Sequence, residues 1–202
     1  MWSICLFFMG YWRWIALTFS SLSLVASTSC STTRAGADSY GSVPDFTLTD
    51  QTGAEFSSAK ELRGVNWIAD FIYTTCPGPC PRMSSQMHQV EKAFDGDSKV
   101  KFVSFTVDPE HDTPPVLDEY GKRFGAKPGV WFFLTGHQDT LHYLSRDVFK
   151  LGDVDGNLEH STRFVLVDKK SQLRGFYLTS EPDAIDRLIE DTKTLERRER
   201  DE

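Results

Sequence analysis

The sequence has no run of basic residues that could line a nucleic-acid site. Its 22 Lys and Arg residues are interspersed with 29 Asp and Glu residues, and the formal net charge is -7. Because a nucleic-acid surface needs basic side chains gathered on one face to neutralise phosphates, we exclude nucleic acid as a partner. Internal repeats are absent as well, which excludes a fibrous or repeat architecture.

Cysteine is also scarce, with four in the whole chain. Cys5 and Cys30 belong to an N-terminal leader, so Cys76 and Cys80 are the only thiols of the expected folded part. A disulfide between cysteines so close in sequence closes a small loop and gives little entropic stabilisation, and the surrounding prolines restrict its geometry. A purely structural disulfide is therefore disfavoured, which leaves a redox couple or a pair of metal ligands.

Charge is nearly absent from residues 2–26, where Arg13 is the only charged residue. An arginine at the centre of a membrane-spanning helix costs about 2.5–3.5 kcal/mol on insertion scales, so an uncut anchor that starts at Met1 is unfavourable. If Met9 is the start, Arg13 becomes the positive end of a signal peptide and residues 14–26 its apolar core.

Cys30 lies just after this apolar run and is followed by a polar segment. It resembles the lipid-bearing cysteine of a bacterial lipoprotein, although Ser27 stands where such signals usually carry Leu. We therefore expect residues 1–30 to be a signal peptide or a lipoprotein leader, with a retained anchor as the alternative. Each possibility exports the domain that follows.

The whole chain of 202 residues is 40% hydrophobic, which is enough for one substantial core. We expect a flexible linker over residues 31–42, one domain over residues 43–195 and a charged tail over residues 196–202. Apolar alternation and apolar runs predict an entry hairpin and then strands at 65–73, 100–107, 131–134, 162–167 and 173–177. Helical spacing predicts helices that begin after Pro81, at Thr113, at Asp139 and at Glu181. This order predicts an α/β fold, a thioredoxin-like mixed sheet sandwiched by helices with an N-terminal hairpin.

Cys76 follows the most apolar strand, residues 65–73, and precedes a helix. The free amides and the positive end of the dipole at a helix N-terminus favour a thiolate, which is both a nucleophile and a ligand for soft metals. Three residues separate Cys76 from Cys80, whereas thioredoxin-like reductases have two. If the loop coils helically, both sulfurs face one side and can converge on one ion.

A third metal ligand should come from the five histidines. His88 lies within a predicted helix and His111 in a polar loop, which makes them weaker candidates. His160 precedes the strand at 162–167, and in a thioredoxin-like topology the residue at this place lies against the cysteine loop. Reductases carry a cis-proline there, and this segment has none. We expect His160 to be a ligand, with a loop histidine hydrogen-bonded to backbone as the alternative.

Two thiolates and an imidazole form a soft set of few ligands. This set suits a copper ion, Cu(I) or Cu(II), better than magnesium, calcium or manganese, while zinc remains open on ligand type alone. Three protein ligands leave the coordination open, which suits transfer of the ion rather than a closed structural site.

Four blocks of sequence together resemble the SCO/SenC family of copper chaperones. The blocks are Asp45-Phe-Thr-Leu-Thr-Asp-Gln-Thr-Gly53, Cys76-Pro-Gly-Pro-Cys80-Pro, Val107-Asp-Pro-Glu-His-Asp-Thr-Pro114 and Glu159-His160-Ser161 before Phe164. The resemblance implies a thioredoxin-like domain with Cys76, Cys80 and His160 as copper ligands. It also implies delivery of copper to the copper-A centre of cytochrome c oxidase. From the leader we expect the domain to lie on the periplasmic side of a bacterial membrane, tethered by the leader or by lipid.

Two departures from the family pattern lie beside the ligands. Gly78 stands where family members commonly have Asp between the cysteines, and Glu159 stands where they have Asp. The loss of a carboxylate near the cysteines should favour thiolate slightly, because like charges no longer repel. The ligands themselves are kept, so the departures put the identity of the partner in doubt rather than the site.

Two further features admit a functional and a structural interpretation. Asp108 could orient His160 or a bound water, because metal-bound imidazoles usually donate their second N–H to an acceptor, or it could only shape the Asp-Pro turn. Met83 and Met87 could contact copper, but their helical period with Val90 and Phe94 favours packing in the core.

The alternative function is that of a thiol-disulfide oxidoreductase that keeps the cysteines of a client reduced. Cys76 would then attack, Cys80 would resolve, His160 would tune the pair, and a thioredoxin-like reductant would restore the dithiol. A peroxidase is disfavoured because that chemistry does not call for a second cysteine so near.

Overall fold

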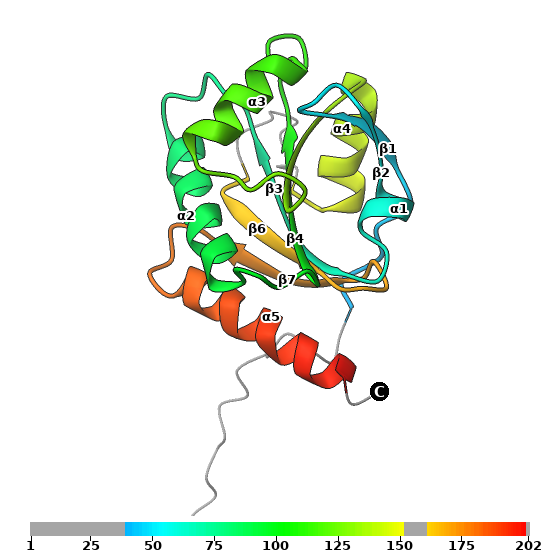
Figure 1. The fold of residues 1–202 in the computed structure, drawn as a ribbon, viewed down its shortest axis with the longest axis vertical. Helices are drawn as coiled ribbons and strands as arrows, with labels where there is room; N and C mark the ends of the chain where they lie inside the picture. The colour runs from blue at the N-terminus through cyan, green and yellow to red at the C-terminus, as the bar shows by residue number, and fades with distance from the viewer. Residues whose placement is uncertain (1–38, 152–160, 201–202) are drawn as a thin grey trace, which may run out of the picture. The chain divides into compact units, whose positions relative to one another are not determined.

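The computed structural model describes residues 39–151 and 161–200, which form one mixed sheet with helices on both faces (Figure 1). The seven strands lie in the order β2-β1-β5-β4-β3-β6-β7. Their bounds are β1 Thr47–Asp50, β2 Glu55–Ser57, β3 Asn66–Ile72, β4 Val100–Thr106, β5 Trp131–Thr135, β6 Arg163–Val167 and β7 Leu173–Leu178. The helices are α1 Ser58–Glu61, α2 Pro79–Ala93, α3 Pro114–Arg123, α4 Gln138–Tyr143 and α5 Ala184–Arg200. The predicted α/β sandwich with its entry hairpin is confirmed.

The parallel strands β3 and β4 determine where the site lies. They pair in register from Asn66 opposite Val100 to Ile72 opposite Thr106. All seven residues of β3 are buried, as expected for an apolar strand covered on both faces. Because the two strands end together, the cysteine loop after β3 and the loop after β4 leave the same edge of the sheet.

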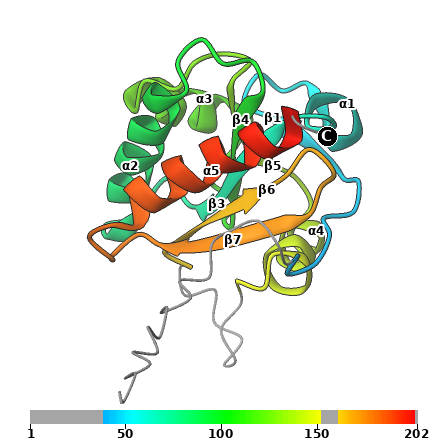
Figure 2. The ribbon, with the colours of Figure 1, turned by 90° about the horizontal axis from the view of Figure 1, so that it is seen from below.

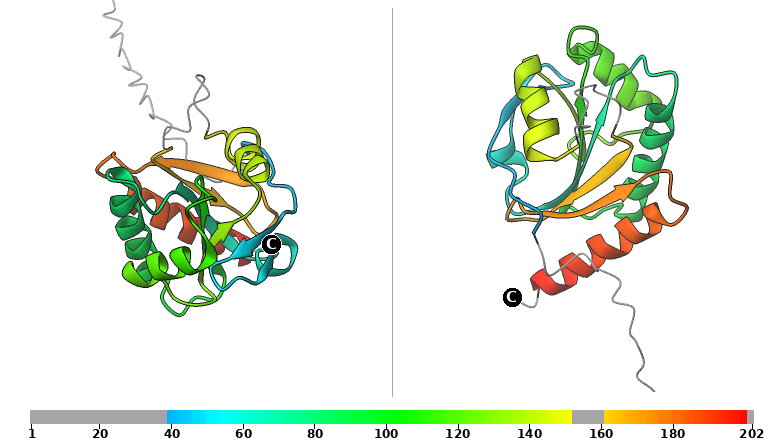
Figure 3. Two further views of the ribbon diagram at one scale, coloured as in Figure 1. Left: turned by 90° about the horizontal axis from the view of Figure 1, so that it is seen from above. Right: turned by 180° about the vertical axis from the view of Figure 1, so that it is seen from behind.

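Side-chain alternation along the strands divides the core into two clusters. We call the side of Ile68 and Ile72 the α2 face, where α2, α3 and α5 pack. We call the side of Trp67, Ala69 and Phe71 the α4 face, covered by α4, the following π-helical turn Leu144–Val148 and the entry hairpin. Figure 2 shows α2 and α5 on one side of the strands and α4 on the other, and Figure 3 shows the same separation from above and behind.

The closing helix is longer than the sequence analysis predicted. We expected it to end at Leu195 and a solvated tail to follow, but α5 continues to Arg200. Tertiary contacts hold this extension: Glu196 is buried, and the carboxylate of Glu199 accepts a hydrogen bond from the Asn66 amide at 3.0 Å. Basic residues in the last turn also interact favourably with the helix dipole.

Four other features differ from the expectations. The predicted helix at 139–151 is divided into α4 and the π-helical turn, and the short helix α1 was not predicted. Helix α2 begins at Pro79 rather than after Pro81, so it includes Cys80. The end of the expected linker pairs with the residue just before β7, through an isolated bridge between Ser42 and Gln172.

Within the described ranges, we find no helix that is long and apolar enough to cross a membrane. The predicted leader, residues 1–30, lies outside these ranges, so its role stays a prediction.

Candidate metal and redox site

The cysteine loop connects β3 to α2. Gly78 precedes the helix, and Pro79 occupies a first-turn position where a missing N–H is tolerated. Cys80 lies in the first turn of α2 with 1% of its surface exposed, and Cys76 lies before the helix with 6% exposed. Both cysteines are free thiols. The local sequence therefore places one thiol just before a helix N-terminus and the other within its first turn.

The environment of Cys76 favours the thiolate. Burial alone would raise the pKa of Cys76, but hydrogen bonds from the backbone amides of Cys80 and Gly78 and from the side chains of Cys80 and Tyr73 lower it. These donors stabilise negative charge on the sulfur, as expected at a helix N-terminus. The direction of this shift agrees with the expectation that the start of the helix favours a thiolate at Cys76, and the chemical role of Cys76 stays a prediction.

The environment of Cys80 favours the thiol instead. Burial raises the pKa of Cys80 to about 12, and the nearby negative groups Cys76 and Asp70 add to this shift. A hydrogen bond from the Tyr73 backbone only partly offsets it. The two sulfurs are therefore unequal: the surroundings favour the thiolate at Cys76 and the neutral thiol at Cys80.

Tyr73 is a site residue that the sequence analysis missed. Its side-chain hydrogen bond to Cys76 raises the pKa of Tyr73 to about 12, with burial as the next cause. The phenol thus stays protonated and donates to the sulfur. In the sequence, Tyr73 could have been recognised only by its position three residues before Cys76, directly after the buried strand β3.

Asp112 is a second missed residue, and it connects the loops that follow β3 and β4. Its carboxylate is fully buried. The Thr74 hydroxyl donates to Oδ1 at 2.5 Å, and the Thr74 backbone N–H lies 3.1 Å from Oδ2. The Thr106 hydroxyl donates to Oδ2 at 2.5 Å. One side chain thereby fixes the cysteine loop to the end of β4.

Asp108 lies at the same edge, as predicted. Its backbone N–H donates to Thr106 Oγ1 at 2.9 Å, and its carboxylate Oδ1 lies 2.9 Å from His111 Nδ1. The bond to Asp108 raises the pKa of His111, whose side chain is 70% exposed. The negative charge of Asp108 is also a minor cause of the raised pKa of Tyr73, so Asp108 acts electrostatically on the start of the cysteine loop.

His160, the predicted third ligand, lies outside the described residues. So does Glu159, and so do Cys5 and Cys30 of the leader. Over residues 39–151 and 161–200, no three His, Cys, Asp or Glu side chains are grouped to hold a metal ion. Cys76 and Cys80 are brought together, while the role of His160 and its orientation by Asp108 stay predictions.

A buried carboxyl group, Asp70, lies in β3 on the α2 face. Ser104 donates to Asp70 Oδ1 at 2.6 Å, and Trp131 Nε1 donates to the same serine oxygen at 2.9 Å. Asp70 Oδ2 has no hydrogen-bond partner among the residues that the structure describes. Burial raises the pKa of Asp70 to about 7, so near neutral pH the group is partly protonated. Its charge acts on Cys80 and on Tyr120.

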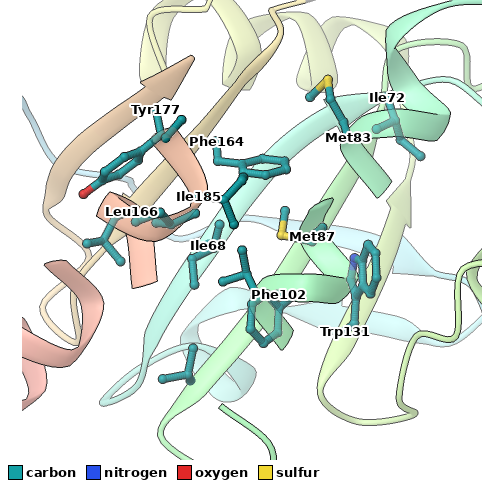
Figure 4. Close-up of a cluster of buried hydrophobic side chains, with 14 of the residues drawn as sticks. Ile68, Ile72, Met83, Met87, Phe102, Trp131, Phe164, Leu166, Tyr177 and Ile185 are labelled. Carbon is teal, nitrogen blue, oxygen red and sulfur yellow. The ribbon is translucent and has the colours of Figure 1, made fainter. Parts of the chain in front are cut away.

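The two methionines of α2 pack in the core, as predicted. Figure 4 shows Met83 and Met87 among Ile68, Ile72, Phe102 and Trp131. Both methionines are fully buried and belong to the cluster of the α2 face. Their helical spacing with Val90 places them on the face of α2 that meets the sheet.

The pair of sulfurs fits two kinds of chemistry. As thiolates they suit a soft metal ion, and the four donors around Cys76 already stabilise the charged form that such an ion requires. As an unequal pair they also suit disulfide exchange, in which one sulfur attacks and the other resolves. The departure at Gly78 leaves space, since a Cβ added there would meet nothing within 4 Å.

Comparison with known proteins gives a consistent result. Residues 34–196 match the family model described as SCO1/SenC. The SCO1 protein homolog of Bacillus subtilis is 30% identical over 158 residues, which cover 75% of this chain and 81% of that protein.

Solved structures of the same family resemble the fold. A SCO1/SenC family lipoprotein from Bacillus anthracis has a TM-score of 0.69 at 30% identity and covers 77% of this chain and 95% of its own. BsSco, described as a member of the Sco family of cytochrome c oxidase assembly proteins with a disulfide switch, has a TM-score of 0.68 at 30% identity, over 79% and 96% of the two chains. Yeast Sco1 with copper bound has a TM-score of 0.60 at 25% identity, over 79% and 96%.

Proposed function

The chain belongs to the SCO1/SenC family, and from this premise we propose that it is a copper chaperone of cytochrome c oxidase assembly. It captures the ion between Cys76, Cys80 and His160 and passes it to the copper-A centre of an oxidase subunit. The observation that carries the proposal is the pair of free, buried thiols at the start of α2, one of them surrounded by donors that favour the thiolate. The copper-bound structure of yeast Sco1 and the oxidase-assembly role given for BsSco support the choice of metal and client.

Ligation by both sulfurs requires both to be thiolates. Cys76 is already favoured in this form, whereas Cys80 must release its proton as the ion binds. Affinity should therefore rise with pH, and acidification should favour release. Transfer to a client would exchange one protein ligand at a time for a ligand of the client, which needs the reduced dithiol.

Replacement of His160 tests the third ligand. We expect His160→Ala to weaken Cu(I) binding at least about 10-fold in a competition titration with a chelator, because the site loses one of its three proposed ligands. His111→Ala is the matched control, since His111 is exposed at the same edge and is bound to Asp108. Unchanged copper affinity in His160→Ala would remove His160 from the site.

A second function, thiol-disulfide oxidoreductase, is favoured by the unequal environments of the two cysteines. The Cys76 thiolate would attack a client disulfide, form a mixed disulfide and release one client thiolate. Cys80, after losing its proton, would then attack Cys76 and release the second client thiolate, so that two electrons pass to the client and Cys76 and Cys80 form a disulfide. A thioredoxin-like dithiol would restore the reduced pair. In the His160→Ala experiment, a loss of Cu(I) affinity with exchange intact supports the chaperone, whereas unchanged Cu(I) affinity favours the oxidoreductase.

We further propose that the protein is exported and tethered on the periplasmic side of a bacterial membrane. The apolar leader with Cys30 supports export, and the similarity to the Bacillus anthracis lipoprotein supports a lipid tether. Fractionation of the source cells tests this proposal: recovery in the cytoplasm would overturn it.

A further inference from the structure

The bonds of Asp112 hold the segment just before Cys76. Thr74, two residues before Cys76, donates both its hydroxyl and its backbone N–H to the Asp112 carboxylate. The Cys76 N–H in turn donates to the Tyr73 carbonyl at 3.2 Å. The backbone on the N-terminal side of Cys76 is therefore fixed through Thr74 and Tyr73.

The other contacts of Asp112 are anchored in the sheet. Thr106, the last residue of β4, is fully buried, and its hydroxyl both donates to Asp112 Oδ2 and accepts the backbone N–H of Asp108. The Asp112 backbone N–H donates to the Asp108 carbonyl at 2.9 Å. Asp112 thus joins the loop that carries Cys76 to the buried end of β4.

Only a carboxylate satisfies this arrangement. Asp112 receives hydrogen bonds from two hydroxyl groups and one amide, and an ionised carboxylate accepts at both oxygens. An asparagine of the same shape would turn an NH2 group toward at least one of these donors. Replacement by asparagine therefore removes part of the contact set while keeping the volume of the side chain.

We propose that Asp112 is the positioning residue for Cys76: through Thr74 it sets the path of the loop so that the sulfur lies at the amides of Gly78 and Cys80. The inference deepens the proposed function, on which its copper readout rests. Asp112 contacts neither sulfur in this role and acts through the loop.

A matched control exists at the opposite end of the sheet. Asp168 has 1% of its surface exposed and accepts hydrogen bonds from the backbone of Lys170 and Gln172, both at 2.8 Å, and from Arg174 at 2.7 Å. It follows β6, whose last residue Val167 pairs with Trp67 near the beginning of β3, far along that strand from Cys76. Asp168→Asn should therefore lose a similar set of bonds without affecting the thiols.

The experiment compares Asp112→Asn with Asp168→Asn in the reduced full chain. Three quantities are measured: the rate of Cys76 alkylation by iodoacetamide as a function of pH, the Cu(I) affinity by chelator competition, and the urea midpoint. For Asp112→Asn we expect the alkylation profile to shift to higher pH and the Cu(I) affinity to fall about 10-fold, as for supporting residues of metal sites. For Asp168→Asn we expect only the urea midpoint to fall.

A second pair of variants covers the case in which Asp112→Asn does not fold. Thr106→Val removes one donor to Asp112, and Thr106→Ser restores it. We expect the first to shift the Cys76 profile and the second to return it to that of the wild type. If Asp112→Asn and Thr106→Val change only the urea midpoint, as Asp168→Asn does, the positioning role is wrong. A wild-type chain that binds no copper would overturn the proposed function, and the alkylation profiles would still decide the role of Asp112.

Discussion

Both faces of the central sheet carry aromatic side chains, but among the described residues the sulfur atoms and the buried Asp70 lie on the α2 face alone. The α2 face holds both cysteines, both methionines of α2 and the buried Asp70, with polar contacts such as Ser84 to Tyr120 at 2.9 Å. The α4 face is filled by aromatic rings that contact one another. These rings are Phe46, Phe56, Trp67, Phe71, Phe105, Phe132 and Phe149.

This difference separates stability from chemistry. Aromatic pairs contribute about 0.5–1.5 kcal/mol each beyond the burial of their surface, so the α4 face is strongly stabilising. The α2 face includes a carboxyl group with an unpartnered oxygen among the described residues, which is unfavourable in an apolar layer. Proteins commonly violate packing rules at functional sites and compensate elsewhere. Here aromatic contacts on both sides of the same strands offset that cost.

Removal of a central ring should have the largest effect. Phe105 lies 4.9 Å from Phe71, 5.5 Å from Phe46 and 5.6 Å from Phe149 between ring centroids. Phe105→Ala should lower the free energy of unfolding by about 3–5 kcal/mol, measured by urea denaturation, because it leaves a large cavity. The Cu(I) affinity of the folded fraction should not change.

Ile72→Ala is the matched variant on the α2 face. Ile72 is also fully buried, and it is the last residue of β3 before the cysteine loop. It should lose both stability and Cu(I) affinity. Equal loss of Cu(I) affinity in Phe105→Ala would show that the two faces are not separate in function.

Asp70 should make stability depend on pH. Its pKa is raised from 3.8 to about 7, so the folded state binds more protons than the unfolded state between these values. The stability is therefore greatest below the unfolded pKa and is lost as pH rises through about 7. Between pH 5 and pH 8 we expect a loss of roughly 3 kcal/mol from this group.

Asp70→Asn isolates this contribution. Asparagine keeps an oxygen for the Ser104 hydroxyl but does not titrate, so the urea midpoint should vary much less between pH 5 and pH 8 than in the wild type. His111 and Glu196, whose pKa values are also raised, remain in the variant and account for the residual slope. An unchanged pH profile would mean that Asp70 does not titrate in this range.

Much of the fold could be predicted because its signals are local. The apolar run of β3 and the helical spacing of Met83, Met87 and Val90 each indicated the correct element. The errors lie where distant contacts decide. The end of α5 depends on a contact with Asn66, which is 133 residues away in the sequence. The π-helical turn after Tyr143 packs on the α4 face, a contact that the local sequence does not show.

The placement of the two thiols was predicted for the same reason, while their function stays a prediction. Cys76 and Cys80 were found from their spacing and from the strand and helix around them. Asp112 was not, because its role appears only once β3 and β4 are paired and their loops meet. Asp70 is visible in the sequence as a charged residue inside a mostly apolar strand. A buried charged residue is uncommon, so its position indicates either a functional role or a loss of stability.

The smallest effect should come from the methionines of α2, and it tests whether their sulfur atoms matter on the face that carries the chemistry. Leu has nearly the volume of Met, so the double variant Met83→Leu, Met87→Leu should change the free energy of unfolding by less than about 1.5 kcal/mol per site. Because both side chains pack in the core, Cu(I) affinity should stay within about twofold of the wild type. Cys80→Ala, on the same helix, is the positive control for a lost sulfur ligand. A marked loss of Cu(I) affinity in the double variant would mean that the α2 face supplies thioether ligands as well as thiols.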